Sequence, residues 1–90
     1  METLLKPGDM IRIRNDIDED TSYSMILDPD NKNNWIEKEM AKPNELVTIE
    51  RINKGQYKIR NEHNRINLWD YTDEMFDQEA IRLLMIDRNN

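Results

Sequence analysis

The middle of the chain constrains the fold most, because it reads as two β-strands joined by a tight turn. Residues 45–52 (ELVTIERI) alternate in polarity, as a half-buried strand does. Residues 53–56 (NKGQ) follow, and Gly55 tolerates the positive φ angle that a hairpin turn requires. Residues 56–60 (QYKIR) then return with Tyr57 on the core face. The sequence therefore predicts a β-hairpin in this region.

Two further segments extend the hairpin into a β-meander. Residues 6–9 (KPGD) are a turn signal, and residues 10–14 (MIRIR) alternate between apolar and basic side chains. Residues 61–64 form a polar turn, after which residues 65–69 (RINLW) read as the next strand. We expect Trp69 and Phe76, which flank the segment WDYTDEMF, to close one end of the domain.

Residues 15–34 lack periodicity and are rich in Asp and Asn, which predicts a long first loop. A structureless stretch of this length is unusual in a compact domain. Either residues 23–27 form a short strand, or the loop packs its apolar side chains back onto the core. Residues 35–41 follow as a helical turn, which ends before Pro43.

The C-terminal third combines a short helical turn with an ambiguous final segment. Thr72 is the expected N-cap for a turn over residues 73–76, with acidic residues near its N-terminus. Residues 78–88 (QEAIRLLMIDR) fit both a helical stripe and a strand alternation. We favour a closing strand or an extended tail, including residues 81–90.

Length and composition set the class of protein. Ninety residues make one domain with a small core, and 37% of them are hydrophobic against 36% charged. The chain has no cysteine, so disulfides and Cys-type zinc sites are excluded. It shows no signal-peptide pattern and no apolar run long enough for a membrane span. We therefore expect a cytoplasmic protein that does not interact with membranes.

The net charge of -6 comes from one segment. Between Asn15 and Asn31 there is no Lys or Arg, and the acidic residues there are Asp16, Asp18, Glu19, Asp20, Asp28 and Asp30. Such a segment repels nucleic-acid phosphates and anionic lipids, so direct nucleic-acid binding is not expected. It is either a solvated loop or an acidic surface for a basic partner.

Four stretches resemble a group of short proteins common in phages and prophages of Gram-positive bacteria. They are LKPGDMIRIR, EMAKPNELVTIERI, GQYKIR and LWDYTDEMFD, and Tyr23 lies where those proteins tend to carry a tyrosine. The resemblance implies a mainly β fold over residues 1–90: a small SH3-like barrel of about five strands, with a long first loop and a one-turn helix before the last strand. Asn44 replaces a common glycine, and the segment from Ile81 onward extends past the usual end. Members of this group are mostly uncharacterised, so no reaction is implied.

Catalytic and metal sites have little support in this sequence. The single histidine, His63, lies in a polar turn and has no cysteine to activate. Residues 16–27 and 28–39 resemble calcium-binding loops, but they carry Thr21 and Asn33 where such a loop needs glycine. We therefore expect neither enzyme activity nor a cofactor or metal.

Loop aromatics are the remaining candidate site. Tyr23, Trp35 and Tyr71 lie in predicted loops that can approach each other in an SH3-like barrel. They either form a groove for proline-rich or basic peptides or make a satellite cluster that covers the long loop.

Two hypotheses follow from these residues. The first is a non-enzymatic module that binds a host or phage protein through its loops. The alternative is an acidic inhibitor that mimics nucleic acid and blocks a host defence enzyme, of the anti-restriction or anti-CRISPR type. The oligomeric state is not predicted.

Overall fold

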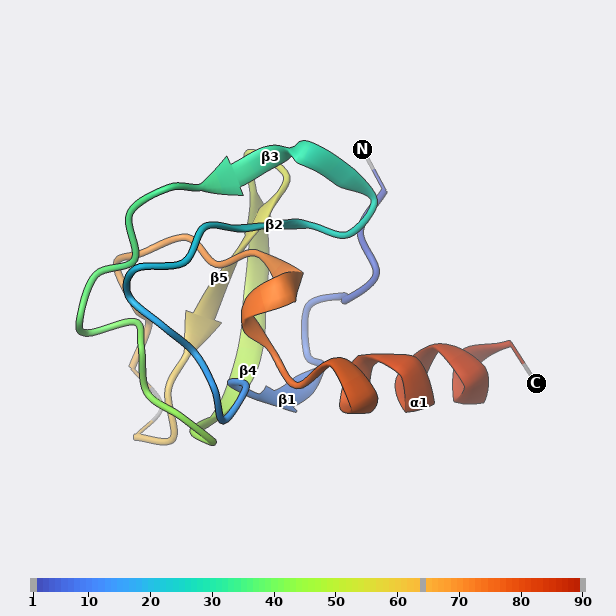
Figure 1. The fold of residues 1–90 in the computed structure, drawn as a ribbon. Helices are drawn as coiled ribbons and strands as arrows, with labels where there is room; N and C mark the ends of the chain where they lie inside the picture. The colour runs from blue at the N-terminus through green and yellow to red at the C-terminus, as the bar shows by residue number, and fades with distance from the viewer. Residues whose placement is uncertain (1, 64, 90) are drawn as a thin grey trace.

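The computed structural model describes residues 2–63 and 65–89. In this part of the chain, five strands precede a short 3₁₀ helix and a C-terminal α-helix (Figure 1). The elements are β1 (Met10–Arg12), β2 (Tyr23–Met25), β3 (Asp28–Asn33), β4 (Leu46–Asn53), β5 (Gln56–Arg60), the 3₁₀ helix η1 (Asp73–Met75) and α1 (Gln78–Arg88).

The larger sheet has the order β1-β4-β5, with antiparallel neighbours. Ile11 pairs with Val47 in the β1–β4 register, and Ile49 pairs with Ile59 between β4 and β5. The predicted hairpin is confirmed, and its two turn residues Lys54 and Gly55 have φ angles of 53° and 75°. Both residues thus have a left-handed backbone conformation, as a two-residue hairpin turn requires.

The segment predicted as a long first loop forms a second antiparallel hairpin, β2–β3. The alternative that residues 23–27 contain a short strand is confirmed by β2, whereas β3 was not predicted. Its sequence, DPDNKN, contains Pro29 and no alternating apolar side chains, so its pairing rests on backbone hydrogen bonds. In Figure 1 this hairpin runs across the direction of β4 and β5.

The segment between β5 and α1 contacts both edges of the larger sheet through isolated bridges. Tyr71 pairs with Tyr57 and Ile66 with Arg60 at the β5 edge, whereas Phe76 pairs with Ile13 beyond β1. The predicted strand over residues 65–69 is therefore wrong, because only Ile66 makes a bridge there. The described residues form two antiparallel sheets and no closed barrel.

Residues 78–88 form α1, so the expected closing strand or extended tail is wrong. The Asp77 side chain caps the helix by accepting hydrogen bonds from the amides of Glu79 and Ala80. Ile81 is buried, and Arg88 binds the Leu4 carbonyl near the N-terminus. The cap and the helical spacing of the apolar residues override the strand-like alternation. Figure 1 shows the C-terminal end of α1 projecting from the body of the domain.

The remaining turns match their predictions in part. Residues 38–40 form a turn closed by a hydrogen bond from the Met40 amide to the Glu37 carbonyl. η1 follows Thr72 as expected, although the Thr72 side chain makes no capping hydrogen bond. Asn44 has a φ angle of 65°, the left-handed conformation that glycine adopts most readily.

The core fills the space between the two sheets and η1. Tyr71 stacks on Phe76 with ring centroids 6.0 Å apart, and Tyr57 packs against the same ring. The sequence predicts that Trp69 and Phe76 close one end of the domain. Phe76 is fully buried there, but Trp69 lies at the surface, so the prediction is wrong for Trp69. No helix among the described residues is long and apolar enough to cross a membrane.

Candidate binding groove at two tryptophans

A surface hollow of about 220 Å³ lies between the segment after β3 and the segment after β5. Its lining contains two tryptophans, two carboxylates, an amide and a methionine: Asn33, Trp35, Glu37, Met40, Trp69 and Asp70. We call this hollow the tryptophan groove.

Hydrogen bonds between the two segments and within the segment after β5 hold the walls of the groove. Asn33 is the last residue of β3, and its side-chain amide donates to the Asp70 carbonyl at 2.8 Å. The hydroxyl of the buried Tyr71 donates to the Met40 carbonyl at 3.5 Å. The Trp69 amide donates to the Asn67 side chain at 2.9 Å. The groove is therefore attached to the core on both sides.

The two tryptophans of the chain are both exposed in this groove. Trp35 keeps 86% of its surface accessible and Trp69 keeps 39%, whereas Met40 beneath them is buried. Large aromatic side chains are usually buried, and clustered exposed ones mark interaction sites.

The two carboxylates of the groove differ in their partners. Asp70 lies 3.0 Å from the Lys58 ammonium and also accepts hydrogen bonds from the Asn53 side chain. The Glu37 carboxylate makes no hydrogen bond or ion pair with any residue that the structure describes. Among the described residues, Glu37 is therefore the groove carboxylate without a charged partner.

Of the three predicted aromatic residues, Trp35 alone lies at the groove surface. Tyr71 is buried against Phe76, and burial raises the pKa of its hydroxyl. Tyr23 is also buried, with its ring 5.4 Å from the Arg14 guanidinium carbon and its hydroxyl accepting the Asp18 amide. The predicted loop placement of Tyr23 and Tyr71 is thus corrected, because both tyrosines pack in the core from strand or bridge positions and only Trp35 is exposed.

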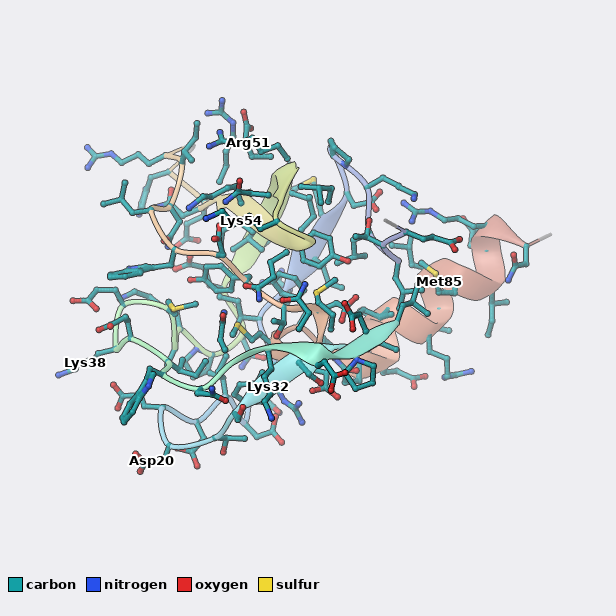
Figure 2. The ribbon with its side chains drawn as sticks, turned by 90° about the horizontal axis from the view of Figure 1, so that it is seen from above. Asp20, Lys32, Lys38, Arg51, Lys54 and Met85 are labelled. Carbon is teal, nitrogen blue, oxygen red and sulfur yellow. The ribbon has the colours of Figure 1, made fainter. Side chains whose placement is uncertain are left out.

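The six predicted acidic residues do not form one compact cluster. Asp16 pairs with Arg14 at 2.7 Å, and this hydrogen bond lowers the pKa of Asp16. Residues 18–20 form an exposed turn next to the start of β2, whereas Asp28 pairs with Met25 at the other end of the β2–β3 hairpin. Asp30 is exposed on β3 between those ends. Figure 2 shows Asp20 and Lys38 at the end of the molecule away from Met85.

A second group of carboxylates fastens the β2–β3 hairpin to η1. Asp73 is fully buried, and it accepts hydrogen bonds from the Ile26 amide at 2.7 Å and the Tyr57 hydroxyl at 3.1 Å. Burial raises the pKa of Asp73. Glu74 accepts from both the amide and the hydroxyl of Ser24, at 2.7 and 2.8 Å. Together they bind the amides of Ser24 in β2 and of Ile26 in the turn after it, so their role is structural.

A larger hollow of about 260 Å³ lies near the start of α1. Several of its side chains already have partners in the fold. Arg14 binds Asp16, Asp77 caps α1, and Gln78 donates to the Asp73 and Phe76 carbonyls. Among the described residues, no group of three acidic or histidine side chains is placed to hold a metal ion. The tryptophan groove is therefore the stronger candidate site.

Sequence reasoning missed most of the groove lining. The sequence predicts Trp69 at one end of the core, and it gives no partner-binding role to Asn33, Glu37, Met40 or Asp70. One available signal was that each tryptophan has an acidic residue beside or near it, as in Trp69-Asp70. Comparison with protein-family models, curated proteins and solved structures finds no match to this chain.

Proposed function

We propose that this domain is a non-enzymatic protein-binding module that engages a host or phage protein through the loops around the tryptophan groove. Under this proposal the module is of the phage type, has SH3-like architecture and acts in the cytoplasm of the bacterial host. One observation carries the proposal: both tryptophans are exposed and line the same hollow.

The energetics of the indole rings favour a partner. Trp35 exposes 86% of a side chain that buries on the order of 150–250 Å² when covered. At about 25 cal/mol per Å², covering it removes from water apolar surface worth roughly 3–5 kcal/mol. This is the upper limit of its contribution to binding, because ordering the ring and the partner has a cost. Buried tryptophans with this contribution are common among the residues that dominate protein interfaces.

The bridges along the larger sheet support the SH3-like part of the proposal. The chain from Ile66 to Phe76 touches the β5 edge first and then continues beside Ile13 after β1. A one-turn helix, η1, interrupts this path. That order agrees with the expected barrel of short strands in which a turn of helix precedes the last pairing.

Affinity capture from a lysate of a Gram-positive host tests the proposal. We expect a retained protein that the wild-type domain captures and Trp35→Ala loses, while the free energy of unfolding of the variant stays unchanged. Leu68→Ala is the matched control, because Leu68 is 85% exposed beside Trp69 but does not line the groove. Equal capture by wild type and Trp35→Ala would reject the groove as the binding site.

The acidic-inhibitor alternative has one observation in its favour. Asp18, Glu19 and Asp20 are exposed in one turn and make no ion pair with a described residue. If this turn mimics nucleic acid, the captured protein is a nuclease or another nucleic-acid-binding protein. Its binding is lost as the salt concentration rises from about 0.05 to 0.5 M, because salt screens exposed charge pairs. Charge-neutralising variants of the turn would then abolish capture, and Trp35→Ala would not.

A further inference from the structure

The composition of the tryptophan groove indicates which kind of side chain it accepts. We infer that the groove binds a single cationic side chain, an arginine or lysine of the partner, between the two indole rings. This inference rests on the proposed function, and it adds the chemistry of the bound group.

The size of the groove favours one side chain over a larger ligand. Its volume is about 220 Å³, below the roughly 300–1,000 Å³ that is typical of small-molecule and cofactor sites. Met40 forms a buried apolar floor, against which the aliphatic stem of an arginine or lysine packs while its charged head stays near the rim.

Indole rings in the lining favour a cation. An ammonium or guanidinium group within about 6 Å of a tryptophan ring centroid is attracted by the negative face of the indole. Arginine adds a planar group that stacks on aromatic rings. The domain already contains such a contact in its own fold, where the Arg14 guanidinium lies over the Tyr23 ring.

The charges of the lining also favour a positively charged side chain. Glu37 supplies a carboxylate that has no partner among the described residues. Asp70 is already held by Lys58 and Asn53, so it shapes the wall and leaves Glu37 as the counter-charge. The part of the lining that the structure describes contains no lysine or arginine, which disfavours phosphate-containing ligands. A neutral proline would stack on the rings but would leave Glu37 unpaired.

The two indole N–H groups provide a direct test, because the chain contains only these two tryptophans. The ¹⁵N-labelled domain is titrated with a short acetylated and amidated alanine peptide that carries one central arginine. The same peptide with citrulline in place of arginine is the matched probe, since citrulline keeps the shape and loses the charge.

We expect the arginine peptide to shift both indole resonances and to bind about 5- to 30-fold more tightly than the citrulline peptide. Glu37→Gln should lower this preference by about threefold, because it removes the free counter-charge. Glu39→Gln is the control, since Glu39 is exposed nearby and does not line the groove.

Two results would overturn the inference. The first is equal binding of the arginine and citrulline peptides, and the second is no shift of either indole at millimolar peptide. The proposed function is judged separately by the capture experiment with Trp35→Ala. A partner that depends on Trp35, together with peptides that do not differ, would keep the proposed function and reject the cationic occupant.

Discussion

The buried carboxylate of Asp73 gives the sharpest stability prediction, because this one side chain of η1 binds both the turn after β2 and Tyr57 of β5. Asp73→Ala leaves the Ile26 amide and the Tyr57 hydroxyl without their acceptor. A buried donor left unpaired costs about 1–3 kcal/mol, which applies to the Tyr57 hydroxyl, whereas the half-buried Ile26 amide costs less because water reaches it. Removal of the carboxylate also ends the cost of its own desolvation, the cause of its raised pKa. We therefore expect a net loss of about 1–3 kcal/mol, a large fraction of the total for a domain of this size.

Asp73→Asn is the matched variant, because its amide oxygen still accepts from Ile26, and it should lose only about 1 kcal/mol. The pH dependence separates the wild type from this variant. Burial raises the folded-state pKa of Asp73, so its contribution to stability is full below the unfolded pKa of about 3.9 and is lost as pH rises through the folded pKa. The wild type should therefore gain stability relative to Asp73→Asn as pH falls from about 7 toward 4.

Urea unfolding followed by far-UV circular dichroism measures these free energies, and amide hydrogen exchange reports on Ile26 directly. We expect the Ile26 amide to be protected in the wild type and to exchange faster in Asp73→Ala. The reasoning would be refuted if Asp73→Ala lay within about 0.5 kcal/mol of the wild type, the usual range of a surface change. A stability advantage over Asp73→Asn that shrinks on acidification would refute the assigned pKa direction.

Three further substitutions test the core, the hairpin turn and the helix cap. Tyr71→Ala removes a ring stacked on Phe76, so it should lower the free energy of unfolding in urea by about 3–5 kcal/mol. Trp35→Ala removes an exposed ring and should change that free energy by less than about 0.5 kcal/mol. Equal losses would contradict the assignment of Tyr71 to the core and Trp35 to the surface. Lys54 has a φ of 53°, a left-handed conformation that asparagine tolerates better than lysine. Lys54→Asn should therefore raise the free energy of unfolding by about 0.5–1 kcal/mol. A decrease would argue against this turn. Asp77→Ala should cost about 0.5–2 kcal/mol and reduce the helical circular dichroism signal, because two amides of α1 lose their cap; an unchanged signal would show that the cap is dispensable.

The β4–β5 hairpin could be predicted because local signals agree there. Alternation of apolar side chains sets each strand, and Gly55 supplies the left-handed turn residue. The β3 strand could not be predicted, because DPDNKN has no apolar period and gains its pairing partner only from the fold. The apolar residues in 78–88 fit both the helical and the strand spacing, and the capping hydrogen bonds of Asp77 favour the helix.

The candidate site was less accessible from the sequence than the fold. Trp35 could be singled out as a loop aromatic, but the exposure of Trp69 depends on where the chain leaves β5. Tyr71 looked like a loop residue because its pairing with Tyr57 is a single bridge with no strand around it. Local periodicity does not record such tertiary pairings, so core and surface aromatics look alike in the sequence.

The most direct test of the central claim is an NMR map of the surface that the captured partner covers. The ¹⁵N-labelled domain is titrated with that partner, and the indole resonances of Trp35 and Trp69 are followed together with the backbone amides. We predict that both indole resonances shift or broaden on binding. Unchanged indoles, together with shifts confined to the amides of residues 18–20, would contradict the tryptophan groove and would place the interaction on the acidic turn.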